Sequence, residues 1–285
     1  MSKLFYNLGL FLFIFLCIVG VICYKNFIVV KNFYFDPKIN KVIMGDSHIS
    51  CGVNDQLIPS TISVANTNES YIYTYYKLKK LLDTKAKIDT VFLGVGYHNF
   101  PASASNGTFN MVHRHIYFLP LHIINHIFKL KNSSSQSQWI PFLKLNFMNA
   151  GSFETQPYWG GYLSNINEKG PVKKDMDKRL QIQYYSNDPE TLFSVNQIQY
   201  FEAIIDLCKQ HSIVPIGLNM PLDPYYESNV PKAYKEKYLN LTKNIKVIDF
   251  KELNFSPKDF LPDGDHVSTK GAAKATLFLK NFIGR

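Results

Sequence analysis

The sequence of 285 residues is poor in cysteine and has no spacing of cysteines that is typical of a metal or redox site. The four cysteines are Cys17, Cys23, Cys51 and Cys208, and none belongs to a Cys-x-x-Cys pair. This spacing argues against zinc and against a catalytic dithiol, although it leaves a disulfide between Cys51 and Cys208 open. We therefore predict no metal, no organic cofactor and no catalytic cysteine.

The sequence also lacks a basic stripe interleaved with aromatic residues. Its net charge is +9, from 31 Lys and Arg against 22 Asp and Glu. Such an excess is compatible with nucleic acid, an anionic membrane or an acidic polymer as partner. The densest basic segments are KLKKLL and PVKKDMDKR, and acidic residues interrupt the second. With no zinc-finger or RNA-binding motif either, we expect a solvated lysine-rich surface and no nucleic-acid partner.

One long apolar run lies near the start of the chain, where no charged residue occurs between Leu4 and Tyr24. A helix of about 20 apolar residues is long enough to cross a hydrocarbon core of roughly 30 Å. The run does not end in a small-residue cleavage site of the A-x-A kind, which favours an uncleaved anchor over a removed signal peptide. We predict a transmembrane anchor at residues 1–24, followed by a linker at 25–39.

The orientation of this anchor follows from its flanks. Lys3 precedes the apolar run, whereas Lys25 and Lys31 follow it, so the count of basic residues is nearly balanced. A very short N-terminal tail usually stays in the cytoplasm when a single anchor leads the chain. We therefore expect a single-pass membrane protein with residues 25–285 on the extracytoplasmic side, which is periplasmic or extracellular.

From residue 40 onward, short β-branched and apolar runs alternate with stretches of helical periodicity. We predict strands at 40–45, 61–66, 89–96, 213–221 and 245–250, and helices at 70–85, 196–212, 231–244 and 269–283. This alternation of strand and helix is typical of an α/β protein with a parallel sheet that is covered on both faces.

Residues 101–195 interrupt the alternation and are expected to form an insertion near the carboxyl ends of the strands. The insertion contains the sequence PYWGGY, in which Trp159 follows Tyr158. Two interpretations of Trp159 are equally open: it stacks on a sugar ring of the substrate, or it packs the insertion onto the sheet.

Two short motifs supply the chemistry. The first strand ends in GDSH, which places Ser47 at the edge of the sheet, and DGDH near the C-terminus contains Asp263 and His266 just before the last helix. A serine hydroxyl needs a base to become a nucleophile, and histidine suits this task because its pKa lies near neutrality. A carboxylate on the other ring nitrogen fixes the tautomer. Asp263 is the first candidate for that carboxylate and Asp265 the second.

These two motifs resemble the nucleophile block and the Asp-x-x-His block of the SGNH (GDSL-like) hydrolase superfamily. The context DGDHVSTKGA is similar to membrane-anchored SGNH proteins that modify bacterial surface polysaccharides or teichoic acids. The resemblance implies a flavodoxin-like three-layer α/β/α fold over residues 40–285. It also implies carbohydrate-ester chemistry, with Ser47, Asp263 and His266 as the catalytic residues.

The two middle blocks of the family differ in this sequence. The family has a glycine after the second strand, where this chain has Asn68, and a Gly-x-Asn after the third strand, where this chain has Gly96 followed by His98 and Asn99. The residues that would form an oxyanion hole are therefore the Ser47 N–H, Asn68, His98 and Asn99, without a choice among the last three. His48, directly after the nucleophile, contacts the substrate or has a structural role.

Together these observations predict a membrane-anchored serine esterase or O-acyltransferase, acetyl being the first candidate for the acyl group, which acts on a cell-surface or exported glycan. A transferase would require a membrane acyl-donor protein as partner, because this chain has one apolar span only. The alternative is a catalytically inactive protein with the same fold that binds a glycan or assists its assembly.

Overall fold

The structure, a computed structural model, describes residues 2–31, 36–84, 87–105, 159–165 and 169–284, together with residues 108, 111, 115, 118–120, 122, 123 and 127. The chain divides into two compact units, one formed by Met1–Tyr34 and Val112–Tyr158 and the other by Phe35–Met111 and Trp159–Arg285. About half of the predicted insertion at 101–195 lies outside the described residues, including all of 128–158.

In the first unit, helix α1 extends over Ser2–Lys31. Its segment Lys3–Lys25 is long and apolar enough to cross a membrane, a property that a signal sequence near the N-terminus shares. The helix continues past the apolar segment to Lys31, so its last turns occupy part of the stretch at 25–39 that the sequence predicts as a linker.

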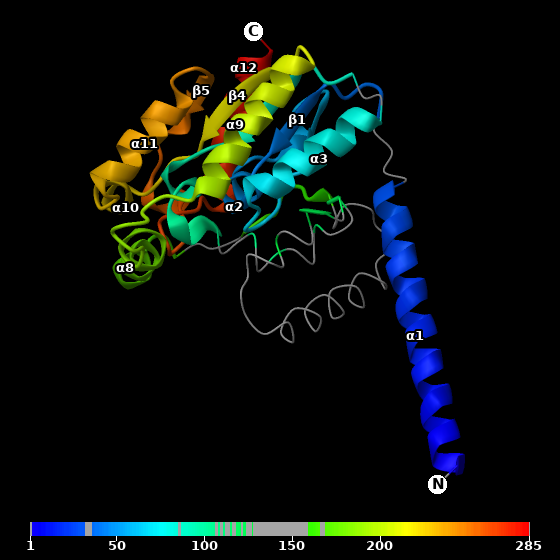
Figure 1. Cartoon of the computed structure of the whole chain (residues 1–285). Helices are drawn as coiled ribbons and strands as arrows, with labels where there is room; N and C mark the ends of the chain where they lie inside the picture. The colour runs from blue at the N-terminus through cyan, green and yellow to red at the C-terminus, as the bar shows by residue number, and fades with distance from the viewer. Residues whose placement is uncertain are drawn as a thin grey trace. The chain divides into compact units, whose positions relative to one another are not determined.

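The second unit is built on a parallel sheet of five strands in the order β2-β1-β3-β4-β5 (Figure 1). The strands are β1 (Lys41–Met44), β2 (Thr61–Ser63), β3 (Thr90–Gly94), β4 (Val214–Asn219) and β5 (Lys246–Asp249). Each lies within a segment that the sequence predicts as a strand. The α/β fold class with a flavodoxin-like strand order is thereby confirmed.

Helices cover both faces of the sheet. Helices α3 (Tyr71–Asp83) and α9 (Val195–Gln210) pack together over one face, whereas α2 (Ser47–Gly52) and α12 (Thr269–Ile283) pack together over the other. The other helices with described bounds are α8 (Lys173–Leu180), which continues into a π-helical turn at Gln181–Tyr185, α10 (Pro224–Ser228) and α11 (Lys232–Thr242). Short 3₁₀ turns lie at Asp55–Leu57, Tyr97–Asn99, Ala102–Ala104, Phe250–Glu252 and Pro257–Asp259.

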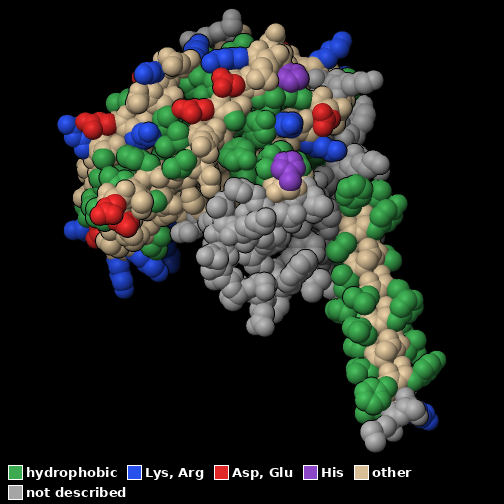
Figure 2. Space-filling view, in the orientation of Figure 1, with side chains coloured by type: hydrophobic (Ala, Val, Ile, Leu, Met, Phe, Trp, Pro, Cys, Tyr) green, Lys and Arg blue, Asp and Glu red, His purple; other side chains and the backbone are tan. Residues whose placement is uncertain are grey.

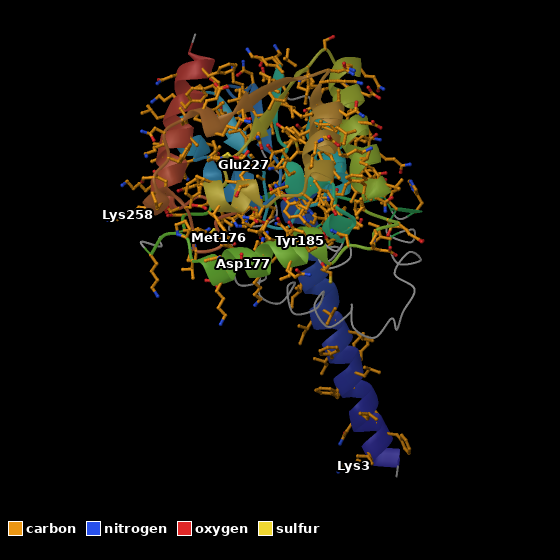
Figure 3. All side chains as sticks on the ribbon, turned by 90° about the vertical axis from the view of Figure 1, so that its left-hand side faces the viewer. Lys3, Met176, Asp177, Tyr185, Glu227 and Lys258 are labelled. Atoms are coloured by element: carbon orange, nitrogen blue, oxygen red, sulfur yellow. The ribbon has the colours of Figure 1, made fainter. Side chains whose placement is uncertain are left out.

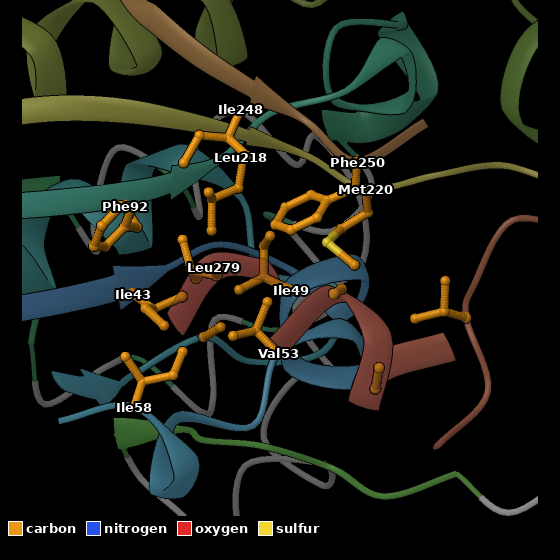
Figure 4. Close-up of a cluster of buried hydrophobic side chains, with 14 of the residues drawn as sticks. Ile43, Ile49, Val53, Ile58, Phe92, Leu218, Met220, Ile248, Phe250 and Leu279 are labelled. Atoms are coloured by element: carbon orange, nitrogen blue, oxygen red, sulfur yellow. The ribbon is translucent and has the colours of Figure 1, made fainter. Parts of the chain in front are cut away.

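A cluster of buried apolar side chains joins the sheet to α2 and α12 (Figure 4). Alternate residues of the strands point to opposite faces, so Ile43 of β1 and Phe92 of β3 face this cluster, where they meet Ile49 of α2 and Leu279 of α12. Val42 and Val91, each next to one of them in sequence, are also fully buried and face α3 and α9. Burial on both faces explains why the strands are continuously apolar.

The strand order fixes where a site can form. From β1 the chain crosses to β2 on one side and returns to β3 on the other, so the loops after β1 and β3 diverge at a switch point. Met44 pairs with Leu93 in the parallel register, so both strands end at the same level. The residues after Met44 and after Gly94 therefore flank a common crevice.

Candidate active site

Ser47 is the first residue of α2, directly after the turn that follows β1. In this turn Gly45 has a φ of +147°, and a Cβ there would lie 3.2 Å from the Gly94 Cα of the neighbouring strand. The turn therefore requires glycine. Asp46 caps α2, since its Oδ1 accepts a hydrogen bond of 3.0 Å from the backbone N–H of His48. Turn and cap together hold Ser47 at the carboxyl edge of the sheet.

The structure brings Ser47, His266 and Asp263 together although the first two are 219 positions apart in sequence. The Oγ of Ser47 lies 2.8 Å from Nε2 of His266, and Nδ1 of His266 lies 2.7 Å from Oδ2 of Asp263. Both distances are those of hydrogen bonds. The order hydroxyl, imidazole, carboxylate is the one that activates a serine for nucleophilic attack.

The loop that carries DGDH is held at both ends. An isolated antiparallel bridge joins Phe260 to Val267, and the N–H of Leu261 donates to the carbonyl of His266 at 2.9 Å. Inside the loop, Oδ1 of Asp263 accepts hydrogen bonds from the N–H groups of Asp265 and His266. Burial acts to raise the pKa of Asp263, but its interactions with His266, which include a side-chain and a backbone hydrogen bond, together outweigh burial, so the pKa lies below its usual range. The carboxylate is therefore charged at neutral pH.

A second polar network lies beside the first and is centred on His48. The Nε2 of His48 lies 2.9 Å from Oδ1 of Asp265, and its Nδ1 lies 3.3 Å from Oδ1 of Asp46. Burial alone would lower the pKa of His48, but the carboxylates of Asp265 and Asp46 raise it to about 10. His48 is therefore an imidazolium held between two carboxylates, and its side chain is only 4% exposed.

Three imidazole rings form a stack in this site. The ring of His48 lies 3.5 Å from that of His98 and 4.5 Å from that of His266, measured between centroids. The planes differ by 16° and 28° respectively, so the contacts are face to face. The stack places a charged ring against the face of the ring that contacts Ser47.

Asp265 connects the stack to the wall of the site. Its side chain is fully buried, and its Oδ2 accepts hydrogen bonds from Nε of Arg179 at 2.7 Å and from Nε2 of Gln183 at 2.8 Å. Burial acts to raise the pKa of Asp265, but the charges of His48 and Arg179 hold it well below its usual range. Asp265 is thus not the orienter of His266, the role for which the sequence made it the second candidate.

A cavity of about 310 Å³ opens in front of Ser47. Most of the described residues that line it are polar, and Ala104 and Ile182 are the apolar exceptions among them. These residues are Asp46, Ser47, His48, Asn68, Glu69, His98, Asn99, Ser103, Ala104, Arg179, Ile182, Gln183 and Gln197. All four residues that the sequence proposes for the oxyanion hole, as well as His48, therefore border one space.

The hydrogen bonds of Asn99 and His98 distinguish these two candidates for the oxyanion hole. The Oδ1 of Asn99 accepts from the Gly96 N–H at 2.7 Å, and its Nδ2 donates to Asp46 at 2.8 Å, so one N–H of the amide has no partner among the described residues. The Nε2 of His98 is engaged by the same Asp46 carboxylate at 2.8 Å. Burial lowers the pKa of His98 and the neighbouring charge of His48 lowers it further, so the ring is neutral and its Nδ1 accepts. This geometry favours Asn99 over His98 as a donor.

Asn68 lies in the loop after β2 and lines the same cavity. Its φ is +56°, a left-handed conformation that asparagine tolerates better than most residues. A glycine would adopt the same backbone conformation without strain.

Two sets of three side chains here could in principle hold a metal ion: Asp46 with His48 and His98, and His48 with Asp265 and His266. The possible ligand atoms of each set lie within 4.8 Å of one another. An imidazole lone pair lies in the ring plane, however, and an ion between the stacked rings of His48 and His98 would lie outside both planes. The arrangement fits a hydrogen-bonded network better than a metal centre.

Trp159 does not border this cavity. Its side chain is 1% exposed, and its carbonyl accepts a hydrogen bond of 2.8 Å from Nζ of the buried Lys77. The following Gly160 has a φ of +109°, and a Cβ there would lie 2.1 Å from the carbonyl oxygen of Ala65. Of the two interpretations of Trp159, the structure supports packing against the sheet; Tyr158 lies outside the described residues.

Sequence patterns did not indicate Arg179 and Gln183. Both lie in the segment that was expected to be an insertion, on α8 and on the π-helical turn. One signal was available, since Arg179 is one of three arginines, with Arg114 and Arg285, among the 31 basic residues of the chain.

No family model matches the chain, and no curated protein matches it. Among solved structures, a "putative platelet activating factor" from Streptococcus pneumonia is similar with a TM-score of 0.42 and 12% identity, over 97% of this chain and 98% of that one. A GDSL-like lipase from Bacteroides thetaiotaomicron has a TM-score of 0.40 and 10% identity, over 93% and 97%. A "putative acylhydrolase" from Bacteroides fragilis has a TM-score of 0.36 and 10% identity, over 86% of each chain.

At identities of 12% or less and TM-scores of 0.42 or less, these similarities carry no function over to this chain.

Proposed function

We propose that the protein is a membrane-anchored serine esterase or O-acyltransferase that acts on short acyl esters of a cell-surface or exported glycan. The observation that carries this proposal is the hydrogen-bonded series of Ser47, His266 and Asp263 at the edge of a polar cavity. A serine that packs for structure alone does not need a base with an oriented tautomer.

In the proposed reaction, Ser47 Oγ attacks the ester carbonyl while Nε2 of His266 takes the hydroxyl proton. The new C–O bond gives a tetrahedral intermediate, whose oxyanion accepts hydrogen bonds from the Ser47 backbone N–H and from the second amide N–H of Asn99. His266 then protonates the leaving alcohol, and an acyl-enzyme remains on Ser47. Asp263 keeps the proton on Nδ1 of His266 throughout and stabilises the imidazolium.

The second half of the reaction repeats these steps with another nucleophile. A water molecule (esterase) or a sugar hydroxyl (transferase) loses its proton to His266 and attacks the acyl carbonyl, which releases Ser47. For a transferase, the acyl group would be supplied by a membrane acyl-donor protein near the anchor α1.

The proposed location is extracytoplasmic. Protease accessibility of the second unit in intact cells tests this location.

The lining of the cavity supports a small acyl group and a polar alcohol. In the described part of the lining, only Ala104 and Ile182 offer apolar side chains, so a long acyl chain would be in contact with charged and amide groups there. Burying a methylene is worth about 0.8 kcal/mol in an apolar pocket, a gain that a polar lining does not provide. We expect p-nitrophenyl acetate and propionate to be cleaved with higher kcat/KM than the octanoate.

The test uses the full chain in a non-ionic detergent and compares it with Ser47→Ala. Hydrolysis of p-nitrophenyl acetate and covalent labelling of Ser47 by a fluorophosphonate, located by mass spectrometry, are both expected for the native protein and absent in the variant. Ser50→Ala is the matched control, because Ser50 lies on the same helix but does not line the cavity.

Two results would contradict the proposal. The first is hydrolysis that persists in Ser47→Ala, because the nucleophile would then be another group. The second is a folded protein that neither hydrolyses the ester nor reacts with the fluorophosphonate. In that case the inactive glycan-binding or assembly protein becomes the better interpretation.

A further inference from the structure

We propose that Arg179 forms an anion subsite in the cavity and binds a carboxylate or phosphate group of the ester substrate. The inference rests on the proposed function and specifies its substrate class as esters whose alcohol or acyl part carries a negative charge near the reacting carbonyl. Arg179 is held by a buried carboxylate and lines the same cavity as Ser47.

The orientation of Arg179 is fixed from behind. It lies in the last turn of α8, and its Nε donates to Oδ2 of the fully buried Asp265 at 2.7 Å. The same oxygen accepts from Gln183 of the π-helical turn that follows, and Tyr226 in turn donates its hydroxyl to Oε1 of Gln183. A guanidinium held in this way needs little reordering to bind a ligand, which favours affinity.

The free donors of Arg179 are at the cavity. Among the described residues, no hydrogen bond or ion pair involves its two terminal nitrogens, and its side chain is 34% exposed. Arg179 and Ser47 line the same cavity. The unpaired N–H groups of a guanidinium form a planar fork that matches the oxygens of a carboxylate or a phosphate.

The charges around Arg179 are balanced. Asp265 and Asp46 together match the charges of His48 and Arg179, and Glu69 is paired with the buried Lys77. The attraction of an anion therefore comes from the terminal N–H groups of Arg179 at the cavity, and no excess of positive charge among these side chains is needed for it.

The surface around the subsite adds to this effect. Helix α8 carries the exposed residues Lys173, Lys174 and Lys178 against Asp175 and Asp177. Blue side chains gather at this end of the second unit in Figure 2, and Figure 3 labels Asp177 on α8 and Tyr185 on the π-helical turn that continues it. The positive potential of this helix would draw an acidic substrate toward the cavity.

The first experiment compares ester probes that differ only in charge. The full chain in a non-ionic detergent is given 3- and 4-acetoxybenzoate, 4-acetoxyphenyl phosphate and the neutral acetoxybenzamides, and kcat/KM is measured for each. We expect kcat/KM to be higher for a charged probe than for its neutral counterpart, so that the ratio of the two values exceeds one, for at least one position of the charge. The ratio should fall about tenfold in Arg179→Gln, as for loss of a charged hydrogen bond at a partly exposed site.

Two variants distinguish binding by the planar guanidinium fork of Arg179 from attraction by positive charge alone. Arg179→Lys should recover part of the ratio, because it keeps the charge and loses the planar fork. Lys178→Gln, one position away and exposed, removes the same charge without lining the cavity and should leave the ratio within about twofold. The better of the carboxylate and phosphate probes identifies the natural anion. An equal ratio in the native protein and Arg179→Gln for every probe would overturn the subsite.

The second experiment does not require catalysis. Inorganic phosphate and benzoate are titrated by calorimetry into Ser47→Ala, with and without Arg179→Gln, at constant ionic strength. Saturable binding that disappears with Arg179→Gln supports the subsite even if the protein proves not to be an esterase. Binding that is absent, or unchanged by Arg179→Gln, refutes the subsite while leaving the proposed esterase function intact.

Discussion

Replacing His48 with glutamine should remove a dependence of stability on pH that the native protein shows in the alkaline range. In the folded state, Asp265 and Asp46 raise the pKa of His48 from its usual 6.5 to about 10. The stabilisation from this shift is complete below the unfolded value of 6.5 and is lost as the pH rises toward 10. Between these values the folded protein retains a proton that the unfolded chain has released.

The magnitude follows from that one proton. Each pH unit in this window lowers the free energy of unfolding by about 1.4 kcal/mol, so the interval from pH 7.5 to 9 should remove about 2 kcal/mol. His48→Gln has no such proton, and its free energy of unfolding should change by about 2 kcal/mol less over the same interval. The variant will also be less stable at pH 7.5, because two carboxylates lose a buried partner.

The assay is urea unfolding of the full chain in a non-ionic detergent, followed by fluorescence at several pH values. His98→Gln is the matched control, because burial and the charge of His48 lower the pKa of His98 and confine its effect on stability to acidic pH. It should keep the alkaline slope of the native protein. Parallel curves for the native protein and His48→Gln between pH 7.5 and 9 would refute the assignment of His48 as an imidazolium.

Three further substitutions test the catalytic assignment and the packing. Asp263→Asn keeps the shape of the triad but favours the wrong tautomer of His266. It should therefore lower kcat for p-nitrophenyl acetate by up to about 10⁴-fold. The fold should be retained, which circular dichroism would check. Gly160→Ala should lower the free energy of unfolding by on the order of 2–4 kcal/mol, because its Cβ would meet the Ala65 carbonyl; an unchanged Tm would contradict this close approach. Leu279→Ala opens the cluster beneath the sheet and should cost about 2–5 kcal/mol in urea unfolding, whereas the exposed Leu277→Ala on the same helix should change stability by less than about 0.5 kcal/mol.

The strands and the longer helices of the second unit could be predicted because their signals are local. The apolar run before GDSH predicts β1, and the periodicity of 196–212 predicts α9 to within two residues at each end. The helix predicted at 269–283 has the same bounds as α12. Helix α2, with six residues, is too short to show a periodicity, and it was missed.

The site could be predicted only in part. Ser47, Asp263 and His266 belong to two motifs whose chemistry is complementary, so their meeting was expected, and their catalytic role remains a proposal. The network of His48, Asp265 and Arg179 was not expected, because its hydrogen bonds join residues that are far apart in the sequence. Arg179 and Asp265 are separated by 86 positions, and His48 and Asp265 by 217. No local pattern specifies such pairs, and His98 was considered without its partner Asp46 for the same reason.

The alternation of side chains along the DGDH loop has a consequence for how this sequence can change over time. Asp263 and His266 belong to the hydrogen-bonded series that ends at Ser47, whereas Asp265 between them forms hydrogen bonds with His48 and Arg179. A neutral residue at position 265 would leave Arg179 without its counter-ion and His48 with Asp46 alone, so we expect positions 48, 179 and 265 to change together. Among homologues we expect these three positions to covary while the residues that flank Asp265 stay constant, and a collection in which position 265 varies independently of position 48 would contradict this coupling.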